Sequence, residues 1–411
     1  MNSNQATFGA GAATALGVEA ITRNSAEKLL KEKIVQLSAQ PEFQWKEGQT
    51  NYEQDPDGSP AVRVALAGCS VDFDLWAGLR NPAKVGIYPV GFQEIWEYYA
   101  GNRKKRTDAS GRATIFQLSE PFLEAKKRYN RVLIISALLP LSKEIFATYN
   151  QYVRNKSFSP WDGYCKAWSE CNQLLDRGIT RLAMSLGSKT RVVVAMNDAT
   201  VEKISTEAVP LTRQGASHGV CKEVNYPQKS IAVLTGLAQF GVSRMVFRDE
   251  IVQGEVRRLM GTLRSIVIFH SDEENTSDGG EVLPISTGWQ EKTESLSDFT
   301  VLDPQVNSHR FCTYLPGNGE RGCGKCLAFC PSDALAKSSP GTNGKYPKPL
   351  LDQEHRFWDG SLQFDNGSCC DDRGQLHTLY DEWMCGRCVA ICAAEGNRRE
   401  EAAKLWESIN G

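Results

Sequence analysis

The chain has 411 residues, more than one small module needs, and this length indicates two or three domains. Lysine and arginine number 47 against 49 aspartate and glutamate residues, so the net charge is −2, which argues against nucleic acid as the main partner. A hydrophobic fraction of 41% with 23% charged residues is typical of a folded globular protein and excludes collagenous and disordered chains.

A weakly apolar run of small residues lies near the N-terminus, at 8–17. It is similar to the apolar part of an export signal, although no basic segment precedes it, and an Ala/Gly-rich tail is the alternative. No stretch of the sequence approaches the roughly 20 consecutive apolar residues of a membrane helix. The predicted location is therefore the cytoplasm or the membrane periphery, with a processed export signal as one origin of the run.

Three short runs are continuously apolar and contain β-branched residues, as strands buried on both faces tend to be. They span 131–136, 191–195 and 265–269. Helical periodicity marks three longer segments, which span about 141–155, 164–186 and 228–240. Strands separated by helices predict a central sheet in a domain of the α/β or α+β class.

Two polar segments divide the chain. Residues 40–62 combine Asp, Gly and Pro and are predicted to form a surface loop. Residues 271–300 are acidic and polar and are predicted to be a loop or linker. The predicted organisation is an N-terminal extension over 1–62, a sheet domain over 63–305 and a cysteine-rich domain over 306–411.

Cysteine is distributed unevenly, since nine of the 13 lie between Cys312 and Cys392. A chain of this size can bury a large core and needs no disulfides to fold, so this cluster calls for another explanation. The remaining four are expected to be ordinary buried thiols: Cys69, Cys165, Cys171 and Cys221.

The clustered cysteines form two similar sets, each with a detached cysteine followed by Cys-x2-Cys-x3-Cys. The first set is Cys312, Cys323, Cys326 and Cys330, and the second is Cys369, Cys385, Cys388 and Cys392. This spacing is typical of [4Fe-4S] ligands in bacterial ferredoxins, and Pro331 fits the first position of a helix that follows the turn. Zinc held by four thiolates is the main alternative, and disulfides are a second. The two matched third cysteines favour iron–sulfur clusters.

In two-cluster ferredoxins the last cysteine of each run ligates the other cluster. Applied to this chain, that rule assigns one cluster to Cys312, Cys323, Cys326 and Cys392. It assigns the other to Cys369, Cys385, Cys388 and Cys330. Cys370 is then a spare thiol beside Cys369. Two such clusters conduct single electrons, so the sheet domain is expected to hold the acceptor.

Beyond the cysteines, three regions of the sequence carry a family resemblance. They span 235–261 (a Gly-Leu-x-x-x-Gly turn followed by Arg-Leu and a strand), 311–335 and 358–392 (Trp, Phe-Asp and a lone cysteine before the second set). In these regions the chain resembles the corrinoid and iron–sulfur reductases, which include reductive dehalogenases and epoxyqueuosine reductases. The register favours Cys369 over Cys370 as a ligand. Ten residues separate Cys312 from Cys323, where the family has two, and Ala393 follows Cys392 in place of proline.

The resemblance implies a nitroreductase-like cobalamin-binding core followed by a ferredoxin-like domain with two [4Fe-4S] clusters. The implied activity is reductive removal of halogen from a small organohalide, with electrons passing through the clusters to the corrinoid. One alternative is corrinoid-dependent reduction of an epoxide or alkene, and another is a non-catalytic electron-transfer subunit. The implied partners are a low-potential electron donor protein or a membrane anchor subunit. A homo-oligomer is compatible with the sequence.

In this family a tyrosine donates the proton, assisted by a basic residue. The resemblance implies Tyr164, at the start of the predicted helix 164–186, with Tyr152 and Tyr226 as alternatives. An ordinary tyrosine is protonated at neutral pH and can donate. The five histidines have no two at ligand spacing, and each is expected to have a packing or surface role.

The resemblance also identifies candidates in the turn after 235. It implies that Gly236 and Gly241 contact the cofactor. Val242 occupies the family's basic position, so Arg244, two residues on, is the nearest candidate to assist the tyrosine or hold the departing halide. The arginine pair at 257–258 and the basic residues at 222–229 are predicted to be solvated.

Overall fold

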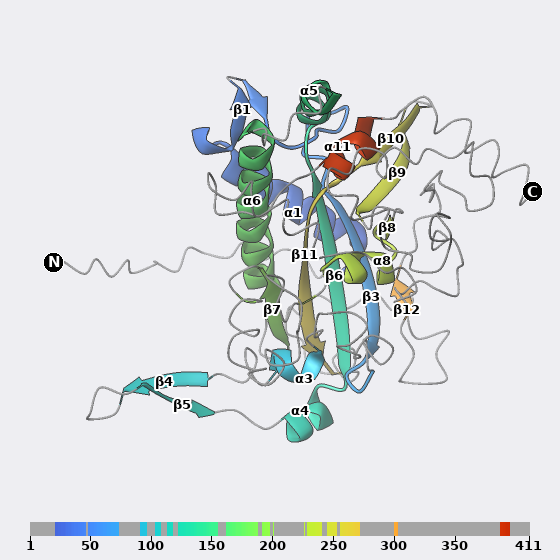
Figure 1. The fold of residues 1–411 in the computed structure, drawn as a ribbon. Coiled ribbons are helices and arrows are strands. Elements are labelled where there is room, and N and C mark those ends of the chain that lie inside the picture. The colour runs from blue at the N-terminus through green and yellow to red at the C-terminus, as the bar shows by residue number, and fades with distance from the viewer. Residues whose placement is uncertain are drawn as a thin grey trace, which may run out of the picture.

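The computed structural model describes about half of the chain. Described are residues 21–46, 48–73, 91–96, 103–107, 113–117, 122–154, 162–187, 191–197, 200, 226, 228–240, 245–252, 255–271, 300–302 and 387–394. The helices are α1 (Arg23–Ser38), η1 (Pro41–Phe43), α3 (Phe92–Ile95), α4 (Phe122–Arg128), α5 (Lys143–Arg154), α6 (Asp162–Leu186), α8 (Gln228–Leu234) and α11 (Arg387–Ala394). The strands are β1 (Gln44–Lys46), β2 (Gln49–Thr50), β3 (Arg63–Ser70), β4 (Arg103–Thr107), β5 (Ala113–Gln117), β6 (Arg131–Pro140), β7 (Val192–Met196), β8 (Gln239–Phe240), β9 (Val246–Val252), β10 (Glu255–Leu259), β11 (Gly261–His270) and β12 (Thr300–Leu302) (Figure 1).

A five-stranded sheet in the order β12-β3-β6-β11-β7 forms the centre of the described fold. The three predicted strands are confirmed as β6, β7 and β11. Every neighbouring pair in this sheet is antiparallel, and β6 pairs with β11 from Pro140 opposite Gly261 to Arg131 opposite His270. The α+β class is therefore confirmed, while the α/β class, which requires a largely parallel sheet, is wrong.

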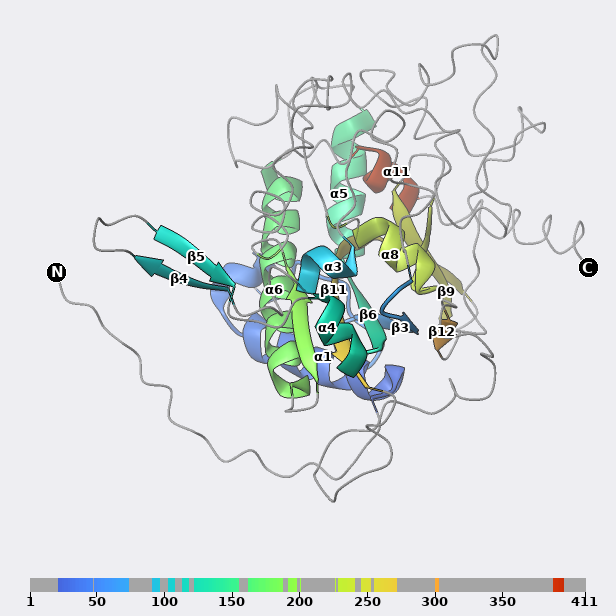
Figure 2. The same ribbon diagram turned by 90° about the horizontal axis from the view of Figure 1, so that it is seen from below.

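Helices cover both faces of this sheet, because its central strands are apolar on both sides (Figures 1 and 2). Side chains alternate between the two faces of a strand. In β6, Leu133 and Ile135 join the hydrophobic cluster formed with α1, α5 and α6, whereas Val132 and Ile134 join the cluster formed with α3, α4 and α8. The former is called the α6 core and the latter the α8 core below.

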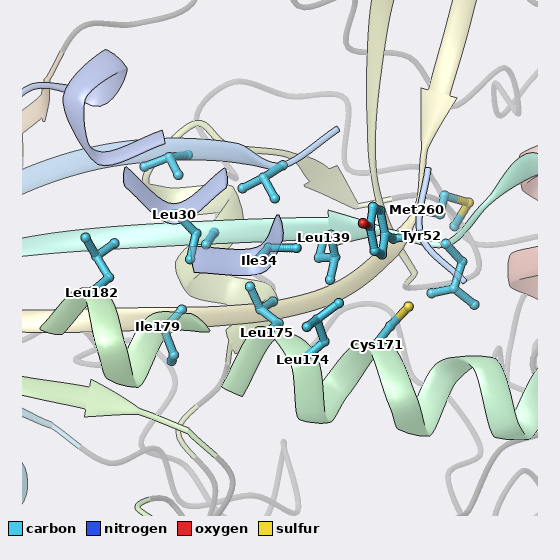
Figure 3. Close-up of a cluster of buried hydrophobic side chains, with 14 of the residues drawn as sticks. Leu30, Ile34, Tyr52, Leu139, Cys171, Leu174, Leu175, Ile179, Leu182 and Met260 are labelled. Atoms are coloured by element: carbon cyan, nitrogen blue, oxygen red, sulfur yellow. The ribbon is translucent and has the colours of Figure 1, made fainter. Parts of the chain in front are cut away.

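The long helix α6 confirms the predicted helical segment 164–186, and α5 confirms that at 141–155. Figure 3 shows how α6 directs Leu175 and Ile179 toward Leu30 and Ile34 of α1, with Leu139 of β6 beside them. Burying each such side chain stabilises the fold by about 1.5–3 kcal/mol. Among the described helices, none has the length and apolar character needed to cross a membrane.

The third predicted helix, 228–240, is wrong in its second half. Helix α8 ends at Leu234, and residues 239–240 form strand β8. The reason is Gly236, whose φ of 73° is left-handed and ends a helix at no steric cost. Its N–H donates to the Val233 carbonyl 3.1 Å away, and the Ala238 N–H donates to that of Ala232, also at 3.1 Å. Gly236 is thus explained by the backbone turn.

The predicted loop at 40–62 is also wrong in part. It contains η1, β1 and β2, and Tyr52 is buried. The Tyr52 hydroxyl donates to Ser38 Oγ at 2.9 Å, and Tyr52 bridges to Leu141 next to the end of β6. Tyr52 therefore fixes this segment to the sheet. The polar and turn-forming residues around it in the sequence are typical of a loop, so its burial could not be predicted.

Gly261 joins strand β10 to the central strand β11 at a point of close backbone approach. A Cβ atom there would lie 2.1 Å from the Leu139 carbonyl oxygen and 2.5 Å from Pro140 Cα. Because both are backbone atoms, we expect Gly261→Ala to destabilise the fold by about 3 kcal/mol. The urea midpoint measures this. Gly187→Ala is the control, since its Cβ meets nothing closer than 3.7 Å; equal midpoints for the two variants would contradict the prediction.

Candidate functional site

Helix α11 brings the end of the second cysteine set into the fold of the sheet domain. Its Val389 and Ala390 are buried in the α6 core, and the helix packs against α5 (Figures 1 and 2). The helix includes Cys388 and Cys392, four residues apart and so on one helical face. It begins at Arg387, so Cys392 lies inside the helix and not at its start.

Cys392 lies against an arginine of the sheet domain. The Arg258 Nη1 group of β10 donates to Cys392 Sγ at a distance of 3.1 Å. Cys392 is half-buried and also packs against the α6 core. An N–H donor directed at a cysteine sulfur is the kind of hydrogen bond that orients a metal ligand. The donor chemistry at Cys392 therefore fits a ligand to an iron–sulfur cluster.

Arg258 is held rigidly by its own hairpin. In the β9–β10 register it lies opposite Asp249, and the pair is bidentate, with Nε–Oδ1 and Nη2–Oδ2 distances of 2.7 and 2.6 Å. The guanidinium carbon stands 3.8 Å from the centre of the Phe247 ring, a cation–π contact. The side chains of Arg258 and Asp249 are only 6% and 4% exposed. The predicted solvation of Arg258 is therefore wrong.

The charge of Arg258 is maintained although the residue is buried. Burial by itself lowers the pKa of the guanidinium, but Cys392 and Asp249 outweigh it and raise the pKa above its ordinary value. Sequence reasoning missed both Arg258 and Asp249 as site residues. The available signal was the acidic pair at 249–250 followed by the basic pair at 257–258, which fits a hairpin with cross-strand ion pairs.

An ionic network fixes the same hairpin to the sheet. Arg63 of β3 donates to Glu250 of β9 (Nε–Oε1, 2.7 Å) and to Asp55 (Nη2–Oδ1, 2.7 Å). Arg257 of β10 also donates to Asp55, at 2.7 Å, and Arg248 donates to Glu250 at 2.6 Å. These side chains are at least four-fifths buried. The network holds the strand that carries Arg258.

The network makes stability sensitive to acid. Burial alone raises the pKa of Glu250, but Arg63 and Arg248 outweigh burial and hold it at about 2, below the ordinary 4.5. Since the folded pKa is depressed, Glu250 stabilises fully above pH 4.5, and that stabilisation is lost as the pH falls toward 2. We expect Glu250→Gln to cost on the order of 3 kcal/mol at pH 7 and less at pH 3.

Urea unfolding of the wild type and of Glu250→Gln at pH 7, 5, 4 and 3 measures the gap between their free energies of unfolding. Taking the difference between variant and wild type removes acid effects that both proteins share. Glu124→Gln serves as the control, because the carboxylate of Glu124 forms an ion pair with Lys127 on the surface, where more than half of each side chain is exposed. A Glu250→Gln gap that stays constant with pH would contradict the prediction.

The candidate tyrosines are separated by the sheet. Tyr164 is buried in the α6 core, its ring stacked on Tyr149 of α5 with the ring centres 4.7 Å apart and Trp168 at 5.9 Å. Tyr226 is buried in the α8 core, and burial raises the pKa of its hydroxyl, partly offset by Ser265. Helix α5 contains Tyr152, described by its backbone alone. Of these tyrosines, Tyr164 shares its hydrophobic cluster with α11.

Most of the other predicted site residues lie outside the described residues. These are Arg244, Gly241, Cys312, Cys323, Cys326, Cys330, Cys369 and Cys385. Among described residues, no group of three or more His, Cys, Asp and Glu side chains could hold a metal ion. Cys69, Cys165 and Cys171 are buried, as predicted. Burial raises the pKa of the Cys69 and Cys171 thiols, so neither is a thiolate at neutral pH.

The chain was compared with known proteins in three ways. No model of a protein family matches it, and neither a curated protein nor a solved structure does.

Proposed function

We propose that this protein is a reductase of the reductive-dehalogenase type, in which two [4Fe-4S] clusters deliver electrons to a corrinoid that removes halogen from a small organohalide. The observation that carries the proposal is the pair of cysteine sets, joined to the packing of α11 in the α6 core. A relay must end close to the group it reduces, and α11 connects the second set to the sheet domain.

One cluster is assigned to Cys312, Cys323, Cys326 and Cys392, and the other to Cys369, Cys385, Cys388 and Cys330. The Arg258 contact supports Cys392 as a ligand, because metal ligands in proteins are generally oriented by a hydrogen-bond partner. When bound, a corrinoid would supply the carbon–halogen chemistry, and the protein would position it and exclude competing reactions.

Tyr164 is the proposed proton donor. Its position in the α6 core, the cluster that also contains Val389 and Ala390 of α11, supports it over Tyr226, which lies across the sheet in the α8 core. Arg244 is proposed to assist by stabilising negative charge near the tyrosine or on the departing halide, as an arginine stays protonated. Gly236 and Gly241 are proposed to border the corrinoid.

The proposal is tested on protein reconstituted anaerobically with iron, sulfide and cobalamin. We expect one corrinoid to co-elute with each chain, with an absorption spectrum that changes on reduction by a low-potential dye. Halide release from a chlorinated aromatic or alkene substrate then reports turnover. Intact clusters without bound corrinoid would identify an electron-transfer subunit instead. Bound zinc in place of iron would overturn the proposal.

Tyr164→Phe tests the proton donor. It removes only the hydroxyl, so we expect halide release to fall at least 100-fold while iron, sulfide and corrinoid contents stay unchanged. Tyr149→Phe is the matched control, because Tyr149 forms the other half of the same ring stack. Loss of turnover in Tyr226→Phe with normal turnover in Tyr164→Phe would show that the donor lies on the opposite face of the sheet.

A further inference from the structure

We propose that Arg258 is a positioning residue that sets the reduction potential of one of the two clusters through its hydrogen bond to Cys392. The inference rests on the proposed iron–sulfur function, but it needs neither the corrinoid nor the organohalide substrate. It assigns a role to a buried arginine that lies outside the cysteine-rich segment and that no spacing pattern identifies.

The contact is directional. A guanidinium carries five N–H donors in a fixed plane, and Asp249 accepts one hydrogen bond from Nε at 2.7 Å and one from Nη2 at 2.6 Å. The Nη1 group is directed to Cys392 Sγ at 3.1 Å, well within the range of an N–H···S hydrogen bond. The Phe247 ring, 3.8 Å from the guanidinium carbon, closes one face of the plane. Arg258 therefore keeps its geometry without help from the thiol.

An N–H donor to a ligand sulfur changes the reduction potential of the cluster. Hydrogen bonds to ligand sulfurs are among the factors that set cluster potentials, together with net charge and solvent exposure. An N–H group stabilises a sulfur more as that sulfur gains negative charge, so the bond favours the reduced form. Because Asp249 compensates the guanidinium charge, we attribute the effect mainly to the directed N–H donor. Removing it should make reduction harder.

The effect should be confined to one cluster. Cys392 is assigned with Cys312, Cys323 and Cys326, so the hydrogen bond from Arg258 acts on that cluster. The β9–β10 hairpin is fixed to β3 through Arg63 and Glu250. The hydrogen bond thus connects the framework of the sheet domain to the cluster held mainly by the first cysteine set.

Arg258→Lys and Arg258→Gln test the inference in the full-length, anaerobically purified protein. Lysine retains a positive charge near Asp249, but a single ammonium on a flexible stem cannot reproduce the planar fork that reaches Asp249 and Cys392 together. We expect EPR-monitored redox titration to give a more negative potential for one cluster and no change for the other. The expected shift is at least tenfold in the reduction equilibrium, or about 59 mV for one electron.

Arg257→Lys is the matched control, being adjacent on β10, bound to Asp55 and without a contact to Cys392 among its hydrogen bonds. Both of its cluster potentials should equal those of the wild type. Both Arg258 variants could contain two clusters with the same potentials as the wild type. In that case the inference is wrong, although the proposed function stands. Wild-type protein that contains no iron–sulfur cluster overturns both, and iron and sulfide analysis of that protein identifies this case.

A measurement on wild-type protein tests the hydrogen bond from Arg258 to the cluster even if the Arg258 variants fail to fold. In protein labelled with guanidino-¹⁵N arginine, a hydrogen bond to a ligand sulfur should give a weak ¹⁵N coupling in the ENDOR spectrum of the reduced clusters. The coupling should persist in Arg257→Lys. Its absence from the wild-type spectrum would overturn the inference.

Discussion

Anaerobically purified protein should contain about eight iron and eight sulfide atoms per chain, and Cys326→Ser or Cys385→Ser should each reduce both contents to about four. The two substitutions lie in different cysteine sets and remove ligands from different clusters. Serine keeps the size of the side chain but replaces the soft sulfur with a poor ligand for iron. Colorimetric iron and sulfide analysis, with EPR of the reduced protein, measures the loss.

Two further substitutions act as controls. Cys370→Ser should retain about eight irons, since Cys369 is the assigned ligand and Cys370 its spare neighbour. Cys171→Ala should also retain them, because Cys171 is buried in the α6 core and burial raises the pKa of its thiol. Loss of four irons in Cys370→Ser, with none lost in Cys369→Ser, would exchange these two assignments. Equal iron contents in Cys326→Ser, Cys385→Ser and wild type would contradict the two-cluster assignment.

The central strands could be predicted because burial on both faces leaves a direct trace in the sequence. β6 and β11 are buried from their second residue to their last, and their runs at 131–136 and 265–269 are almost wholly apolar. Helices α5 and α6 could be predicted because their apolar residues recur at the helical period. In these strands and helices a single physical requirement, hydrophobic burial, determines which positions are apolar.

The hairpin β9–β10 could not be predicted in this way, because its buried side chains include charged ones. Arg258 and Asp249 resemble solvated surface residues until the register places them opposite each other. Neither residue would be tolerated in that position without the other. Charge compensation between two strands leaves no hydrophobic periodicity, and for the same reason the site residue Arg258 was missed.

Glycines illustrate the same limit at single positions. Gly236 belongs to a motif that resembles a cofactor-binding turn, and its left-handed backbone gives it a structural reason as well. Gly261 looks unremarkable in sequence, yet the Leu139 carbonyl leaves no room there for a Cβ atom. A glycine can be required by a bound ligand, by a turn or by close approach of another backbone segment. Only the backbone structure distinguishes a turn from a close approach.

Asp249→Asn should be among the most destabilising single substitutions in the sheet domain, at about 3–5 kcal/mol. It removes the compensating charge of a guanidinium that is 6% exposed, and the new amide group would direct an N–H toward another donor. Burial would then disfavour the charged form of Arg258, because its carboxylate partner is gone. Anaerobic urea unfolding, followed by tyrosine and tryptophan fluorescence, measures the loss.

The matched control is Asp72→Asn, which breaks the Lys126–Asp72 ion pair. That pair has the same 2.7 Å separation as the Arg258 Nε–Asp249 Oδ1 contact, but Asp72 is 62% exposed and Lys126 is 31% exposed. Water screens it, so the expected cost is below about 1 kcal/mol. The double variant Asp249→Leu with Arg258→Met should recover most of the stability lost in Asp249→Asn, because replacing both charges leaves none buried alone. If the double variant were no more stable than Asp249→Asn, packing rather than charge compensation would explain the loss.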